Sequence, residues 1–204
     1  MAIDSLDLFV LASVGLILAP GPDTIYVLTR GVSDGRRAGV LSAAGISTGI
    51  LVHTLGAVLG LSVLLKTSAT AFAAVKYVGA LYLVYLGIQT FRDDEPLSIE
   101  NEEQAGHSYL QGVAINVLNP KVALFFLAFL PQFVDSAAAT GQFLALGGIY
   151  AVLTLAYLTG IALLSGRVRT LLAARPSINR GLRWVTSSIF VALGLRLAVG
   201  GSHT

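Results

Sequence analysis

The chain has 204 residues, of which 55% are hydrophobic and only 12% are charged, and its formal net charge is +2. So few charged side chains cannot cover the core of a soluble protein of this length, and the composition therefore predicts an integral membrane protein. The sequence contains no cysteine, which excludes disulfides, thiolate metal sites and a cysteine nucleophile, and the small net charge indicates no nucleic-acid partner.

Six apolar segments are long enough to cross a bilayer as helices, which takes roughly 20 residues each. They are residues 6–29, 39–65, 69–91, 109–133, 142–165 and 182–199. An acidic linker at 92–108 joins two halves, 1–91 and 109–204, of a single transmembrane domain spanning 1–204. Because each half has three spans, a duplicated half inserts upside down the second time. We therefore expect an all-α membrane protein with six transmembrane helices in a 3+3 inverted repeat.

The first apolar segment is interrupted by the motif Ala19-Pro20-Gly21-Pro22-Asp23. Proline lacks an N–H and glycine permits sharp turns, so one half-helix should end here and another begin near Asp23 and Thr24. The free N–H groups and positive dipole of the new helix would bind an anion such as a substrate carboxylate. Asp23 itself has three roles open to it, as a helix cap, as a proton carrier or as the partner of a substrate ammonium.

The fourth segment is interrupted by Asn116-Val-Leu-Asn119-Pro120-Lys121, and Pro120 corresponds in the second half to Pro20 in the first. Lipid cannot satisfy the backbone groups freed by a break, so matching breaks point to the binding site of a secondary transporter. Asn116 and Asn119 can satisfy those groups or contact a polar solute. Lys121 would face the cavity, pair with Asp23 or extend to a membrane interface.

Four glycines of the second segment lie within a narrow stripe on one side of the expected helix, in which successive residues are about 100° apart. They are Gly45, Gly49, Gly56 and Gly60. Small residues placed in this way let another helix approach closely, either within the chain or in a homodimer. His53 lies on the same stripe and should face protein, where it would form an interhelical hydrogen bond or act as a proton relay.

The basic residues predict the orientation of the chain. Nine arginines lie in the loops after the first, third and fifth segments, against Lys66 and Arg196 on the other side. The nine are Arg30, Arg36, Arg37, Arg92, Arg167, Arg169, Arg175, Arg180 and Arg183. We therefore expect these loops in the cytoplasm, close to anionic lipid, and both termini outside.

Several motifs, taken in order over nearly the whole chain, resemble the LysE/RhtB family of bacterial amino-acid exporters. They are Ala19-Pro20-Gly21-Pro22-Asp23, Gly35-Arg36-Arg37-Ala38-Gly39, Gly45-x-x-x-Gly49, Tyr82-Leu83-x-Tyr85-Leu86-Gly87, Asn116-x-x-Asn119-Pro120-Lys121 with Phe125-Phe126, and Pro131-Gln132-Phe133. The resemblance implies a multi-pass carrier of the bacterial inner membrane that expels amino acids and is driven by the proton gradient. No cofactor is expected. The chain has no cluster of intramembrane carboxylates, which favours a neutral or hydrophobic amino acid over a dicationic one.

We therefore predict an alternating-access exporter with its site between the two broken segments. The predicted substrate-binding residues are Pro20, Gly21, Pro22, Asp23, Thr24, Asn116, Asn119 and Lys121. The half-helix starting near Asp23 would receive the substrate carboxylate, and Asp23, Asn116, Asn119 or a free carbonyl would receive the ammonium. Asp23 or His53 would carry the proton.

The alternatives are a carrier for another solute such as a metal cation, a passive channel and a membrane-embedded enzyme. The metal and enzyme alternatives are weaker, because oxygen and nitrogen ligands are sparse at membrane depth and His53 has no second ligand four residues along its helix. We predict no metal site and no enzyme activity.

Overall fold

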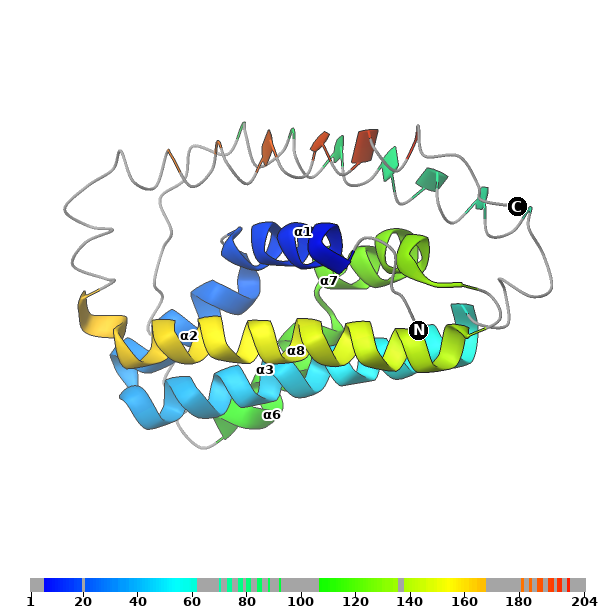
Figure 1. The fold of residues 1–204 in the computed structure, drawn as a ribbon. Helices are drawn as coiled ribbons and strands as arrows, with labels where there is room; N and C mark the ends of the chain where they lie inside the picture. Colours follow the sequence, from blue (N-terminus) through cyan, green and yellow to red (C-terminus); the bar gives the residue numbers. More distant parts are fainter. Residues whose placement is uncertain are drawn as a thin grey trace.

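The computed structural model describes residues 6–19, 21–61, 107–135 and 138–167, with scattered helical residues, singly or in adjacent pairs, between 70 and 92 and between 181 and 198. Within these residues the chain is helical and has no strand, which confirms the predicted all-α class. The helices are α1 (Leu6–Leu18), α2 (Pro22–Ser33), α3 (Arg36–Gly56), α6 (Ser108–Val117), α7 (Pro120–Leu124) and α8 (Ala139–Leu163) (Figure 1).

Both predicted breaks separate bent helices. α1 and α2 meet at an angle of 52°, and α6 meets the segment Pro120–Phe133 at 48°. Pro22 is the first residue of α2, as Pro120 is of α7, because proline suits a first helical position where no N–H is needed. Pro22 rather than Pro20 therefore corresponds to Pro120, and Pro20 itself lies outside the described residues.

Two unbroken helices are long and apolar enough to cross a membrane, Arg36–Gly60 and Ala139–Leu163. With each bent pair counted as one span, the described residues contain up to four spans. These correspond to the segments predicted at 6–29, 39–65, 109–133 and 142–165.

The predicted segments at 69–91 and 182–199, and the linker at 92–108, lie largely outside the described residues. All the residues described between 70 and 92 and between 181 and 198 are helical. Gly194 packs against the earlier of these two segments, since a Cβ added to it would lie 2.7 Å from Val84 Cγ2 and 2.8 Å from the Ala80 carbonyl oxygen.

α3 lies at the centre of the described structure, and it packs most extensively against α6 and α8. Figure 1 shows α3 and α8 side by side, with α1 and α7 near each other on one side of this pair. A buried aromatic core is built around the segment that follows α7. Its ring centroids include pairs 4.9 Å apart, between Phe125 and Tyr150, and 6.1 Å apart, between Phe9 and Phe125. These contacts tie α1 and α8 to the π-helical turn Phe125–Phe129, which follows α7.

Two glycines of the predicted stripe bring α6 close to α3. A Cβ on Gly45 would collide with the carbonyl oxygen of Tyr109, and one on Gly49 would lie 2.8 Å from Asn116 Cβ and from Asn116 Oδ1. Side chains at these positions would therefore push the helices apart, as expected of small residues at a helix interface.

Gly56 and Gly60 do not share this contact. A Cβ added to either one meets no atom within 4 Å among the described residues. Gly60 lies in the π-helical turn Ala57–Leu61, where a wider turn replaces the α-helical spacing used to predict the stripe. A helix-packing role for these two glycines, including one in a homodimer, stays a prediction.

Candidate functional site

Asp23 joins the two breaks. It is the second residue of α2, it is 7% exposed, and its two carboxylate oxygens accept hydrogen bonds from Asn116 Nδ2 at 2.9 Å and from Asn119 Nδ2 at 3.0 Å. The cap of α2 is Gly21, with no side-chain hydrogen bond, so the capping alternative for Asp23 was wrong. The carboxylate lies instead within the first turn, where the helix dipole favours a negative charge.

The two asparagines have different second functions. Asn119 caps α7, because its Oδ1 accepts the N–H of Lys121 at 3.0 Å. Asn116 is fully buried, and within the described part of the chain its Oδ1 has no hydrogen-bond partner. The site therefore contains one carboxylate and one spare amide oxygen, both of them acceptors.

Lys121 extends into the first break. Its Nζ donates to the carbonyl oxygens of Leu16 at 3.3 Å and Ala19 at 3.1 Å, at the end of α1, and forms no ion pair with Asp23. Lys121 therefore contacts the other break and does not pair with Asp23, and its facing a cavity stays a prediction. Gly21 leaves room for the ammonium, since a Cβ there would lie 3.0 Å from Nζ.

His53 contacts the same site from α3. Its Nε2 lies 3.1 Å from the Asn116 carbonyl oxygen, and its ring centroid is 5.8 Å from that of Phe126. A carbonyl only accepts, so Nε2 carries a proton in this interhelical hydrogen bond. His53 and Asp23 thus bind opposite ends of one residue, Asn116.

The remaining predicted residues lie at the edge of this group. Thr24 is half-buried, whereas Pro22 is exposed. The structure therefore brings together five of the predicted residues at the two breaks, with His53 beside them. The five are Gly21, Asp23, Asn116, Asn119 and Lys121.

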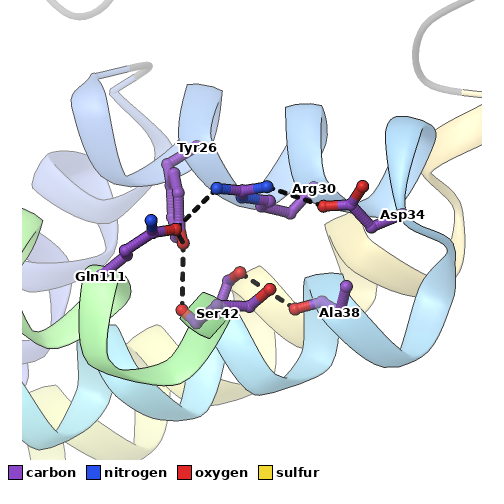
Figure 2. Close-up of polar contacts among 7 residues, drawn as sticks. Tyr26, Arg30, Asp34, Ala38, Ser42 and Gln111 are labelled. Atoms are coloured by element: carbon purple, nitrogen blue, oxygen red, sulfur yellow. Dashed lines mark hydrogen bonds and ion pairs between the residues drawn. The ribbon is translucent and has the colours of Figure 1, made fainter. Parts of the chain in front are cut away.

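A second polar cluster lies two turns along α2 (Figure 2). Arg30 is 2% exposed and donates from Nη1 to Asp34 Oδ2 at 2.8 Å and from Nη2 to Gln111 Oε1 at 2.6 Å. The Tyr26 hydroxyl donates to the same Gln111 oxygen, at 3.0 Å. The prediction that Arg30 lies in a lipid-facing loop was therefore wrong, because it belongs to the last turn of α2 and is fully buried. The spacing of Tyr26, Arg30 and Asp34, four residues apart on one helix face, was the signal for this cluster.

These contacts show that α2 and α6 run antiparallel. Asp23, at the start of α2, binds Asn116 near the end of α6, while Arg30, near the end of α2, binds Gln111 in the first turns of α6. Polar contacts therefore join α2 and α6 at two places, which lie about two helical turns apart along α2.

Comparison with known proteins identifies the family. The family model described as LysE type translocator matches residues 14–201. The chain belongs to the LysE family. It is 31% identical to the homoserine/homoserine lactone efflux protein of Salmonella typhimurium over 194 residues, which cover 93% of this chain and 94% of that protein.

Two further relatives have similar coverage. A leucine efflux protein of Klebsiella pneumoniae is 31% identical over 198 residues, covering 93% of this chain and 92% of the relative. A membrane protein of Vibrio cholerae is 33% identical over 198 residues, covering 93% and 94%. No solved structure matches the chain. Membership of the LysE family confirms the resemblance drawn from the motifs and identifies the chain as a membrane transport protein.

Proposed function

We propose that this protein exports a neutral amino acid, or a close derivative of one, as a secondary carrier of the bacterial inner membrane. The family is a translocator family, and the names of two relatives describe efflux of homoserine or its lactone and of leucine. The proposal also places the start of α3, which bears Arg36 and Arg37, in the cytoplasm, both termini outside, and the six spans in a 3+3 inverted repeat.

The observation that carries this proposal is the buried carboxylate of Asp23, held between two helix breaks by Asn116 and Asn119. An ionised group at this depth is costly unless it has a function or a partner. The carboxylate, the free Asn116 oxygen and the end carbonyls of α1 together suit the ammonium of an amino acid, which donates three hydrogen bonds. When the site opens outward, the two breaks would move apart and this set of acceptors would change. The affinity for the substrate would then be lower on the outer side.

The inverted repeat has support in the way the breaks contact each other. Asp23 and Lys121 are each the second residue of the helix after a break, and each follows a proline. Asp23 binds side chains at the end of α6, and Lys121 binds carbonyls at the end of α1. This reciprocity is what a two-fold axis in the membrane plane would produce.

Proton coupling is part of the proposal, with Asp23 or His53 as the carrier. Both residues bind Asn116, His53 at its backbone carbonyl and Asp23 at its side-chain amide. Protonation of either residue therefore changes the hydrogen bonding of Asn116, which the other residue also contacts. A proton that neutralised Asp23 would remove the charge that attracts an ammonium and would favour release.

Transport assays in proteoliposomes test the proposal. Vesicles are loaded with each labelled amino acid in turn, and a pH gradient is imposed; we expect gradient-driven movement of at least one neutral amino acid. Asp23→Asn removes one titrating group, and His53→Gln removes the other while retaining an N–H donor for Asn116. Loss of the pH dependence in one variant identifies the carrier. Persistence of the coupling in both variants would show that neither residue is the carrier, and a native protein that moves no amino acid would refute the function.

A further inference from the structure

The bond between Lys121 and α1 follows from a vacancy in the backbone. In a continuous α-helix the N–H of residue 20 would bind the carbonyl of residue 16, but residue 20 is proline and has no N–H. Lys121 Nζ donates to this carbonyl, that of Leu16, at 3.3 Å, and to that of Ala19 at 3.1 Å. A side-chain ammonium from one break thus replaces the missing donor of the other.

The α-ammonium of an amino acid has the same chemistry as this Nζ, with one positive charge and three N–H donors. A substrate ammonium that entered beside Asp23 would compete for the same carbonyls. Lys121 would then be free to turn toward the remaining charged group of the substrate, its carboxylate. Gly21, at the first break, leaves space for this movement, because it places no side chain against Nζ.

The charges at the breaks favour Lys121, rather than the amino end of α2, as the group that binds a substrate carboxylate. Between residues 13 and 24 and between 113 and 125 the sequence contains two charged side chains, Asp23 and Lys121. The first turn of α2 already holds the Asp23 carboxylate, and Pro22 contributes no N–H, so a second carboxylate there would meet like charge. Lys121 is the one cation among these residues.

We propose that Lys121 is the residue that recognises the substrate carboxylate, and that it exchanges partners during transport. In the empty site it binds the end carbonyls of α1, and in the loaded site it binds the carboxylate while the substrate ammonium takes those carbonyls and Asp23. This inference rests on the proposed function and goes beyond it, because it makes Lys121 the source of selectivity for zwitterions. Uncompensated charge is costly at membrane depth, so a zwitterion leaves the site balanced, whereas an amino-acid amide adds one positive charge.

Competition between an amino acid and its primary amide tests this assignment. Full-length protein in proteoliposomes is assayed by counterflow with labelled amino acids, and the best of them is then competed with its own unlabelled acid and amide. We expect the native protein to prefer the acid by about 10- to 100-fold, the range of one hydrogen bond between charged groups. In Lys121→Met the preference should fall to within about threefold, and Lys121→Arg should retain most of it. Arg37→Met removes an exposed cation at the start of α3 and should leave the preference unchanged.

The outcomes separate the two proposals. If no amino acid gives counterflow with the native protein, the proposed function fails and the inference fails with it. If counterflow occurs but the native protein accepts the amide and the acid equally, only the inference is overturned. This comparison uses the native protein alone, so it does not depend on the folding of any variant. Equal preference in the native protein and in Lys121→Met would overturn it as well.

Discussion

The contact between Gly49 and Asn116 allows a sharp test of how the site is held together. In Gly49→Ala the new methyl group would lie 2.8 Å from Asn116 Cβ and Oδ1, about 0.6 Å inside the 3.4 Å at which ordinary contact begins. Asn116 is fully buried and is held by its bonds to Asp23 and His53, so it has little room to yield. We expect the Asn116–Asp23 hydrogen bond to lengthen or break.

The expected loss of stability follows from comparison with Gly56→Ala, a substitution on the same helix. Both changes gain about 1 kcal/mol of helix propensity, so this contribution cancels between them. Overpacking costs about 1–3 kcal/mol, and it applies to Gly49 alone, because a Cβ on Gly56 meets no described atom within 4 Å. Gly49→Ala should therefore be less stable than Gly56→Ala by about 1–3 kcal/mol.

Thermal unfolding of the two purified variants in the same detergent measures this difference, and counterflow of labelled amino acid measures its effect on the site. We expect a lower melting temperature and slower counterflow for Gly49→Ala than for Gly56→Ala, which should melt at or above the temperature of the native protein and retain its counterflow rate. Equal melting temperatures and equal counterflow rates would refute the reasoning, since they would mean that α6 moves away from α3 without cost.

Two further predictions concern stability. Gly35 has φ of 88°, a conformation that costs a residue with a side chain about 1–3 kcal/mol, so Gly35→Ala should melt at a lower temperature. Gly160→Ala is its control, because both added methyl groups meet open space among the described residues; similar melting of the two variants would contradict a backbone cause. Gln111→Leu removes the oxygen that accepts from both Arg30 and Tyr26, and it should destabilise the protein by about 1–3 kcal/mol in denaturation assays. An unchanged midpoint would show that this cluster does not fasten α2 to α6.

The breaks and the main apolar segments could be predicted from the sequence because they follow from local rules. Proline and glycine interrupt a helix wherever they occur together, and a run of apolar residues long enough to span a bilayer is visible without any tertiary information. The convergence of Asp23, Asn116 and Asn119 followed from a further assumption, that both breaks must avoid lipid.

The partners of individual side chains could not be predicted in the same way. The burial of Arg30 depends on Gln111, which is 81 residues away, and the sequence alone placed Arg30 in a loop. The partners of Lys121 are backbone carbonyls at the end of α1; Pro20 frees one of them, but the sequence alone does not tell which side chain binds there. The glycine stripe was projected with a constant α-helical spacing, which does not hold through the π-helical turn Ala57–Leu61.

The π-helical turn Phe125–Phe129 allows this part of the chain to lose one residue while the neighbouring side chains keep their faces. A wide turn of this kind accommodates one residue more than an α-helix would, and removing that residue would let the backbone close into ordinary α-helical turns. Because the wide turn had absorbed the extra residue, the side chains beyond the deletion would keep their faces, and Phe133, whose ring lies 5.5 Å from that of Phe9, would stay in the aromatic core. Homologues that lack one residue at this turn would therefore retain the aromatic core, whereas a deletion in the neighbouring α-helical turns would rotate the side chains beyond it by about 100°.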